Sequence, residues 1–337
     1  MSLQHKIKRI LISRTDSIGD VALTLPMCVW IKQHFPNAQI VYLGRAYTKP
    51  IISKFAVVDS FEDWASIENL SQHEQIQYFK NLAIDAIIHV FPNKKIANLG
   101  KKAQIPLRIG SSHRIYHWLT CNVRVNFSRK RSDLHESQLN FHLLKPLGLL
   151  QIPSIQEIDN LCRQQLMESK AKLPNAIEKI LSERKTVILH PKSQGSALEW
   201  PIENYFQLSK NLANAGFNVL FSGTDNEGVL FRNDIPQHDH IFDLTGKLTL
   251  DEFMVCIQKS NTLVACSTGP LHIAGLYGIQ TIGLYSPRIP IHPGRWKPLG
   301  SQVTVIVFNE DCPDCKAGKN CSCIAHIPVS KVEQLIQ

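Results

Sequence analysis

The sequence predicts an α/β protein with two Rossmann-like, doubly wound parallel sheets, one in each half of the chain. Its 337 residues suffice for two domains of ordinary size. Short, almost continuously apolar runs alternate with helix-like segments, which is typical of parallel strands covered on both faces. A more polar stretch over residues 150–175 separates the halves. We therefore expect domains over residues 1–160 and 170–325, and a helix over 326–337 that packs back on the first domain.

The elements of the first half follow from apolar runs and their boundaries. Runs of strand length lie at residues 8–13, 39–43 and 86–90. Helical segments lie at residues 24–34 and 133–148. Thr24 can act as the N-cap of the first helix, with Pro26 in its first turn. Gly148 fits the end of the second, since glycine adopts the left-handed conformation common at helix C-termini.

The second half repeats the same alternation of strand, small-residue loop and helix. Its apolar runs lie at residues 185–190, 217–221, 261–265 and 281–285. Helical segments lie at residues 202–216 and 271–277. Ligands of such folds bind outside the carboxyl ends of the strands, so the loops that follow the strands are the candidate sites.

Composition indicates a globular protein without a membrane span. Hydrophobic residues make up 44% of the chain and charged residues 19%, as expected for a protein with a core. No apolar run approaches the roughly 20 residues that cross a bilayer. The apolar run after the basic N-terminus is too short for a secretory signal. We expect a cytoplasmic protein without a transmembrane segment, able to lie at the inner membrane surface.

The net charge of +9 lies almost wholly in the first half. Residues 1–160 hold 20 Lys and Arg against 12 Asp and Glu, whereas residues 161–337 hold 17 against 16. A basic surface attracts nucleic acid, acidic lipid or phosphorylated glycans, and a solvated face without a partner fits the same count. No zinc finger, RRM or basic-helix pattern is present, so we expect no nucleic-acid partner.

The turn that follows the run at 261–265 is a candidate phosphate site. It contains Ser267, Thr268, Gly269, Pro270 and His272. A small-residue turn at a helix N-terminus presents backbone N–H groups and partial positive charge to an anion, and proline fits the first turn. A plain connection between strand and helix that binds nothing has the same pattern.

The loop after the first strand contains Asp20 in a Gly-Asp pair. A carboxylate at the carboxyl end of a strand can accept a proton from a substrate hydroxyl. It can equally serve only to complement the dipole of the following helix, which is worth about 0.3–1 kcal/mol. The spacing does not decide between these roles, and the loop lacks the ending of a Walker A motif.

Two further loops in the second half have the composition of a ligand site. Lys192 and Ser193 follow the strand at 185–190, and the lysine can supply a mobile positive charge for phosphate. Gly223 and Thr224 follow the next strand, with Glu227 close behind. Glu227 can accept hydrogen bonds from ribose hydroxyls, or act only as an acidic residue in the first turn of a helix.

Nine cysteines are many for a cytoplasmic protein. Five of them lie in apolar or mixed contexts and fit small core residues: Cys28, Cys121, Cys162, Cys256 and Cys266. The other four cluster near the end: Cys312, Cys315, Cys321 and Cys323. Four thiolates can hold zinc, but the second pair has C-x-C spacing, and disulfides or free thiols fit the cluster as well.

Together these loops resemble those of family 9 glycosyltransferases, the group of the ADP-heptose:lipopolysaccharide heptosyltransferases. The matching segments keep the family's order and span nearly the whole chain: Gly19 to Pro26, His190 to Pro201, Asp243 to Gly246 and Ser267 to Gly278. The resemblance implies a GT-B fold, with the acceptor in the first domain and a nucleotide-sugar donor in the second. It also implies inverting, metal-independent transfer without a cofactor, from a donor expected to be ADP-linked.

The resemblance also implies roles for the candidate residues. Asp20 matches the general base that deprotonates the acceptor. The turn at Thr268 and Gly269, with His272 close by, matches the site of the leaving diphosphate, and Gly223 and Glu227 match the loop that contacts the nucleoside. Two positions depart from the family pattern. Ser267 replaces an Asp that helps to bind the sugar, and Leu198 replaces a Lys or Arg, whose charge Lys192 can supply instead.

The sequence therefore predicts a glycosyltransferase that elongates a lipopolysaccharide-core or other surface glycan. Its partners would be a nucleotide-sugar donor and an anionic glycolipid acceptor at the inner membrane face. Two alternatives remain open from the sequence: a non-catalytic sugar-nucleotide-binding relative, which the departures at Leu198 and Ser267 favour, and a nucleotide-sugar epimerase with the same two-domain architecture.

Overall fold

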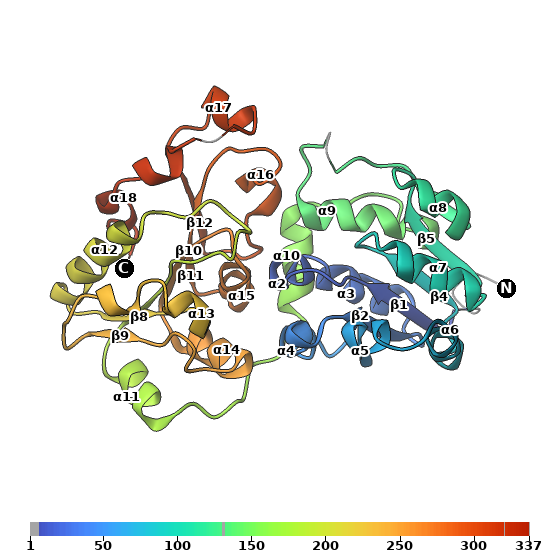
Figure 1. The fold of residues 1–337 in the computed structure, drawn as a ribbon, viewed down its shortest axis with the longest axis horizontal. Helices are drawn as coiled ribbons and strands as arrows, with labels where there is room; N and C mark the ends of the chain where they lie inside the picture. The colour runs from blue at the N-terminus through green and yellow to red at the C-terminus, as the bar shows by residue number, and fades with distance from the viewer. Residues whose placement is uncertain (1–6, 130–131, 320, 337) are drawn as a thin grey trace. The chain divides into compact units, whose positions relative to one another are not determined.

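The computed structural model describes residues 7–129, 132–319 and 321–336, and it divides into two compact units (Figure 1). Unit 1 comprises Met1–Met167 and unit 2 comprises Glu168–Gln337. This division falls within the polar segment that separates the two halves of the sequence. Each unit is an open parallel sheet with helices around it, as the alternation of apolar runs predicts.

Unit 1 contains a six-stranded, all-parallel sheet of order β3-β2-β1-β4-β5-β6. Its strands are β1 Arg9–Ser13, β2 Gln39–Gly44, β3 Ser60–Asp63, β4 Ala86–His89, β5 Leu107–Ser111 and β6 Val123–Val125. Ile10, Leu11 and Ile12 are all fully buried. Both faces of β1 are therefore covered, which explains why this strand lacks the alternation of apolar and polar residues.

The helices of unit 1 alternate with these strands along the chain, as in doubly wound sheets. They are α2 Ile18–Ala22, α3 Leu25–His34, α4 Lys49–Ile52, α5 Trp64–Glu68, α6 Gln72–Asn81, α7 Lys94–Lys102, α8 Ile115–Thr120, α9 Glu136–Phe141 and α10 Ile155–Arg163. Two 3₁₀ segments complete the unit: η1 Ala46–Thr48 and η2 His142–Leu147.

Of the two helices predicted in unit 1, the one at residues 24–34 is observed as α3, and the one at residues 133–148 is not α-helical throughout. A short helix, α2, precedes α3, and the Thr24 side chain donates to the carbonyl of Asp20 (2.8 Å) rather than capping α3. The segment predicted at 133–148 is helical as α9 and continues as the 3₁₀ segment η2, which contains Pro146. It ends at Gly148, as predicted, with the left-handed φ of 104°.

Unit 2 repeats the topology of unit 1. Its parallel sheet has the order β12-β11-β10-β7-β8-β9. The strands are β7 Thr186–His190, β8 Asn218–Phe221, β9 Ile241–Asp243, β10 Thr262–Cys266, β11 Gln280–Tyr285 and β12 Val303–Val307. Counted from its own first strand, this order is identical to that of unit 1. The predicted pair of Rossmann-like sheets is confirmed.

The helices of unit 2 surround the second sheet. They are α11 Asn175–Glu183, α12 Ile202–Asn214, α13 Asp225–Gly228, α14 Leu250–Lys259, α15 Gly269–Tyr277, α16 Pro293–Trp296, α17 Pro313–Lys316 and α18 Val329–Glu333. Two 3₁₀ segments also occur: η3 Arg232–Asp234 and η4 Cys323–His326. None of the helices described is long and apolar enough to cross a membrane.

The C-terminal helix packs on unit 2, which corrects the expectation that residues 326–337 pack on the first domain. The amide of Asn211 on α12 donates to Glu333 Oε2 of α18 (2.7 Å), and Val332 is fully buried. Trp200 Nε1 donates to the carbonyl of Ile327 (3.0 Å). The apolar side chains of α18 complete the hydrophobic core of unit 2, so their burial holds the segment there.

The predicted loops follow the central strands of each sheet, where the direction in which successive strands are added reverses. In unit 1 the chain leaves β1 and β4 in opposite directions across the sheet, and in unit 2 it does so at β7 and β10. Crevices at such points bind ligands because neighbouring loops splay apart there. The segment around Asp20 follows β1, the loop with Lys192 follows β7, and the turn at Ser267 follows β10.

Candidate active site

The turn between β10 and α15 forms a helix N-terminus at the switch point of unit 2. Thr268 occupies the N-cap position with an extended backbone (φ −131°, ψ 166°), and Pro270 lies in the first turn, as predicted. The first N–H groups of a helix have no intrahelical acceptor and carry partial positive charge. The nine-residue helix α15 therefore presents an anion site at Thr268 and Gly269.

The side chain of Thr268 supports a ligand at this turn. Thr268 is buried, with 6% of its surface exposed, and its Oγ1 has no hydrogen-bond partner within the part of the chain that the structure describes. A buried hydroxyl left unpaired costs about 1–3 kcal/mol. A ligand oxygen that accepts from Oγ1 would remove this cost. His272 lies one turn further along α15 and is also buried.

A pocket of about 110 Å³ lies beside this turn within unit 2. It is lined by Gly195, Ala197, Leu198, Ser267, Leu284, Tyr285, Ser286, Arg288, Ile291 and Ile324. The only predicted site residue among these is Ser267. Arg288, in the loop that follows β11, was not predicted, and it lines the same pocket as Leu198. Its position after a strand end was the only sequence signal for it.

The loop after β7 is organised by Glu199, which the sequence analysis did not single out. Glu199 Oε2 accepts from Lys192 Nζ (3.0 Å), while its Oε1 accepts from the backbone N–H (2.8 Å) and Oγ (3.0 Å) of Ser193. Partial burial opposes ionisation, but these hydrogen bonds prevail and lower the pKa of Glu199. Lys192, predicted as a mobile phosphate-binding cation, thus forms an ion pair in this structure.

The loop after β8 forms a capping box. Glu227 Oε2 accepts from the backbone N–H (2.7 Å) and Oγ1 (2.9 Å) of Thr224, whose Oγ1 accepts from the N–H of Glu227 (3.3 Å). This is the helix-terminal role that the sequence left open, and Glu227 is buried in it. A Cβ on Gly223 would lie 3.3 Å from the Glu227 side chain. Gly223 therefore allows the loop to fold this tightly.

The three loops of unit 2 lie together because their strands are neighbours. β7 pairs with both β8 and β10, so the ends of these strands meet at one edge of the sheet. Ser196 Oγ donates to the carbonyl of Ser267 (3.4 Å), and His190 Nδ1 lies 3.0 Å from Ser222 Oγ. Burial lowers the pKa of His190, against the opposing effect of Glu227 and Glu199, and favours a neutral imidazole there.

In unit 1, Asp20 belongs to a cluster of charges centred on a buried arginine. Arg14, with 3% of its side chain exposed, follows β1 and pairs with Asp20 and with Asp16 (2.8 Å). Ser17 Oγ donates to the second oxygen of Asp20 (2.5 Å). The Asp20 side chain is 18% exposed. Both carboxylate oxygens therefore have fixed partners, and part of the group remains accessible.

The balance of charge in this cluster shifts two pKa values. Burial raises the pKa of Asp16 to about 7; Arg14 opposes this effect and the negative charge of Asp20 adds to it. For Arg14, burial disfavours the charge, but Asp16, Asp20 and Glu136 prevail and raise its pKa. Because the effects of burial and of Asp20 exceed that of Arg14, Asp16 holds its proton to unusually high pH.

Helix α9 supplies the remaining partners of the cluster. Glu136, 1% exposed, accepts from Arg14 (3.4 Å) and from Arg129. Ser137 Oγ and Asn140 Nδ2 donate to the carbonyl of Leu23 (2.9 and 3.1 Å). This helix therefore fixes the backbone between α2 and α3, and with it the position of Asp20. Arg14, Asp16 and Glu136 were not predicted. The pairing of Arg14 with Glu136 joins segments far apart in the sequence, whereas Arg14 and Asp16 lie in the same loop as Asp20.

One Rossmann-like unit thus has a helix N-terminus at its switch point, and the other has a carboxylate held by fixed partners. Residues 33–324 match the family model described as glycosyltransferase family 9 (heptosyltransferase). The chain belongs to this family and is a glycosyltransferase.

Curated relatives resemble the chain over most of its length. A Haemophilus influenzae protein named as a glycosyltransferase is 25% identical, over 93% of this chain and 91% of the relative. The lipopolysaccharide core heptosyltransferase OpsX of the same organism is 22% identical, over 90% and 86%. Lipopolysaccharide heptosyltransferase 2 of Escherichia coli is 23% identical, over 84% of each chain.

Solved structures show the same fold. The glycosyl transferase family 9 structure from Veillonella parvula matches with a TM-score of 0.80 at 18% identity, over 100% of this chain and 98% of that one. ADP-heptose LPS heptosyltransferase II of E. coli matches with a TM-score of 0.73 at 18% identity, over 98% and 97%. The α/β GT-B fold predicted from the sequence is confirmed.

The raised pKa of Asp16 predicts a pH-dependent stability. Native Asp16 binds its proton more tightly than the unfolded chain does, so its contribution to stability is present at low pH and is lost as the pH rises through about 7. In urea unfolding, the free energy of unfolding of the Asp16→Asn variant relative to that of wild type should rise by about 2 kcal/mol from about pH 5 to pH 8. The exposed Asp133→Asn variant should track wild type. Parallel curves for Asp16→Asn and wild type would contradict the assignment.

Proposed function

We propose that this protein transfers a glycosyl group, with inversion and without a metal ion in the reaction, from an ADP-linked sugar to a lipopolysaccharide-type acceptor. The observation that carries the proposal is the buried, unpaired Oγ1 of Thr268 at the N-terminus of α15, since it calls for an oxygen-rich anion. Family membership supports glycosyl transfer over epimerisation and over a role limited to nucleotide binding. The relatives' names include lipopolysaccharide heptosyltransferases, which supports the acceptor class.

In this mechanism, Asp20 acts as the general base. The acceptor hydroxyl gives its proton to the Asp20 carboxylate while its oxygen attacks the anomeric carbon of the donor. The bond from that carbon to the diphosphate oxygen breaks, and the electron pair leaves with the diphosphate. Attack opposite the leaving group inverts the anomeric centre. Arg14 and Ser17 hold the carboxylate in one orientation, which preserves its alignment for proton transfer.

The leaving diphosphate is stabilised by fixed donors of unit 2. In this mechanism, the N–H groups at the start of α15 and the hydroxyl of Thr268 donate to the diphosphate oxygens, where negative charge grows as the bond breaks. Removing one preorganised donor of this kind costs about 3–4 kcal/mol in other enzymes. Arg288 supplies the positive charge in the pocket where Leu198 replaces the family's cation. Ser267 lies in the same pocket and would contact the transferred sugar.

Helix α8 gives unit 1 a surface suited to an anionic membrane. Ile115, Trp118 and Leu119 are 87%, 60% and 72% exposed, an unusual concentration of large apolar side chains on one short helix. The guanidinium of Arg124 lies 4.6 Å from the centroid of the Trp118 ring, and Arg114 precedes the helix. Apolar side chains flanked by arginines favour the interface of acidic lipids.

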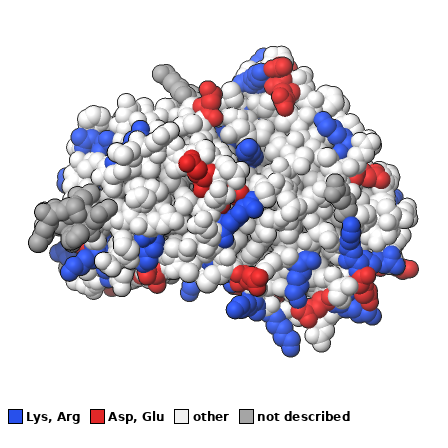
Figure 2. All heavy atoms as spheres, turned by 180° about the vertical axis from the view of Figure 1, so that it is seen from behind, with Lys and Arg blue, Asp and Glu red and all other residues white. Residues whose placement is uncertain are grey.

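The charge distribution on one face of the molecule fits a localised contact better than a nucleic-acid groove. On the face shown in Figure 2, Lys and Arg side chains form separate groups, several of them beside Asp or Glu, with uncharged areas between. A long continuous basic stripe, as nucleic-acid binding requires, is not seen on that face. We therefore place the acceptor at the membrane surface, approached through α8.

The catalytic role of Asp20 is tested by the Asp20→Asn variant. The amide cannot accept the proton, so transfer to lipopolysaccharide from a truncated-core strain should fall by at least about 10³-fold, while ADP binding measured by calorimetry stays within about twofold of wild type. The Asp133→Asn variant should retain full transfer. Wild-type turnover by Asp20→Asn would overturn the assignment of the base.

The donor site is tested by thermal shift against ADP, GDP, UDP and dTDP. Stabilisation grows with ligand concentration relative to Kd, so ADP should raise the melting temperature most. Loss of the guanidinium in Arg288→Ala should weaken ADP binding about tenfold or more, because a charge-assisted contact to phosphate contributes about 1.5–3 kcal/mol. Lys210→Ala, an exposed cation on α12, is the matched control. Equal affinity in Arg288→Ala would remove this residue from the site.

The membrane contact is tested by co-flotation with vesicles that contain phosphatidylglycerol. Replacing Trp118 and Leu119 together by serine should lower binding at least tenfold, since each large apolar side chain contributes about 1.5–3 kcal/mol when buried. The control is Leu150→Ser, because Leu150 is 97% exposed and lies outside α8. Unchanged flotation of the double variant would exclude α8 as the contact.

A further inference from the structure

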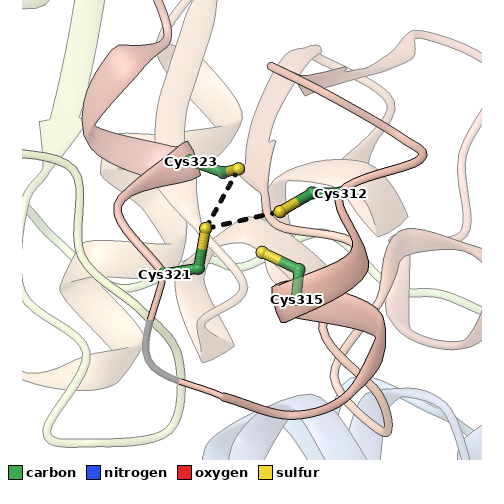
Figure 3. Close-up of side chains that lie close together, drawn as sticks. All are labelled: Cys312, Cys315, Cys321 and Cys323. Atoms are coloured by element: carbon green, nitrogen blue, oxygen red, sulfur yellow. Dashed lines mark hydrogen bonds between the residues drawn. The ribbon is translucent and has the colours of Figure 1, made fainter.

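Four cysteines near the C-terminus converge on one point in unit 2. Cys312 and Cys315 lie on either side of the start of α17, and Cys321 and Cys323 lie at the start of η4 (Figure 3). Their four Sγ atoms all lie within 4.8 Å of one another. Cys312 Sγ is 3.5 Å from Cys321 Sγ, which is 3.2 Å from Cys323 Sγ. The four side chains point toward a common centre.

These distances fit the tetrahedral coordination of a metal ion. Zinc–thiolate bonds of about 2.3 Å in a tetrahedron place the sulfur atoms about 3.8 Å apart. The distances of 3.5 and 3.2 Å are slightly shorter than that value, and no pair of the four sulfur atoms is more than 4.8 Å apart. A disulfide would instead draw the sulfurs into pairs at about 2.05 Å and separate one pair from the other. In this cluster Cys321 is close to two partners at once, which matches shared coordination and not pairing.

The backbone around Cys312 and Cys315 forms a tight turn. The N–H of Lys316 donates to the carbonyl of Cys312 (3.1 Å), and the N–H of Gly318 donates to that of Cys315 (2.9 Å). Gly318 has a φ of 73°, in the left-handed region that favours glycine. This turn brings the chain from Cys315 back toward Cys321, so both pairs face each other across a distance that one ion can span.

Among the described residues, the four cysteines form a small hydrophobic cluster that contains no other side chain. Cys312, Cys315 and Cys323 are 7%, 0% and 7% exposed, and Cys321 is the further hydrophobic residue packed against them. Sulfur contacts alone give a segment of this size little stability, and small folded segments commonly rely on a cross-link or a metal. We propose that Cys312, Cys315, Cys321 and Cys323 bind one structural zinc ion. Four thiolates leave no open coordination position, so the ion takes no part in glycosyl transfer.

The site also determines one wall of the donor pocket. Ile324, which lines the pocket with Ser267 and Arg288, directly follows Cys323. The carbonyl of Ile327, at the other end of η4, accepts from Trp200 Nε1 in the core (3.0 Å). The ion and this hydrogen bond thus hold η4 at its two ends. Cys323 is a positioning residue for the pocket, and this part of the inference rests on the proposed donor site.

The test is the metal content of the full-length chain, expressed without a histidine tag and purified without chelator. Elemental analysis should give about one zinc per chain, and Cys315→Ser should lower it at least fivefold. The control is Cys121→Ala, a buried cysteine of unit 1, which should retain its zinc. Circular dichroism of each variant shows whether the sheets have formed.

Thiol titration keeps the test decisive if Cys315→Ser does not fold. Wild-type protein, denatured without reductant, should release its zinc and titrate all nine cysteines. Fewer than nine free thiols with no zinc would show disulfides and overturn the proposal. Less than about a tenth of an equivalent of zinc after reconstitution under reducing conditions, or iron in its place, would overturn the assignment of zinc.

Calorimetry with ADP tests the effect of the metal site on the donor pocket separately from zinc binding itself. In folded Cys315→Ser, ADP affinity should fall several-fold, whereas a variant with only a general structural defect would lose stability without this change. Wild-type ADP affinity in a variant that has lost zinc would overturn the role of Cys323 in positioning. Failure of wild type itself to bind ADP would contradict the donor assignment and leave the zinc measurement unaffected.

Discussion

The reversal of strand order in each sheet is the constraint on which the functional sites depend. Chains leaving β1 and β4, or β7 and β10, run in opposite directions across their sheets, so the loops between them cannot cover the strand ends. The buried strands supply the rigid base, since their apolar residues are covered on both faces. Polar groups of the following loops then collect at one edge, where a ligand can reach them without disturbing the core.

Buried charge is tolerated in unit 1 because each charge is paired. An isolated guanidinium would not remain at 3% exposure, since desolvation of an ion costs several kcal/mol. Arg14 has three carboxylate partners, and Arg129 shares one of them. The network orients its side chains more than it stabilises the fold, because the cost of desolvating the charges offsets their attraction. Removing any one partner would leave a buried charge uncompensated. Asp20 thereby keeps a fixed orientation, while burial raises the pKa of its neighbour Asp16.

Sequence reasoning recovered what depends on local chemistry and missed what depends on distant pairs. Apolar runs identified the central strands, and the pattern around Thr268 and Pro270 identified the start of α15, because strand burial and helix initiation are short-range effects. The partnership of Arg14 with Glu136 spans 122 positions and leaves no local trace. The pairing of Lys192 with Glu199 was within reach, since both lie in one loop, but composition alone does not reveal which charges meet.

Leu198 and Arg288 line the same pocket of unit 2, although they come from different loops. The sequence departs from its family at Leu198, and taken alone this departure indicates a weakened phosphate site. In the folded unit, however, the pocket collects side chains from loops after β7, β10 and β11. A diphosphate responds to the charge within a few ångströms and not to the strand that supplies it. Arg288 can therefore restore from β11 the charge missing near β7, while Lys192 remains bound to Glu199 and keeps the first loop folded.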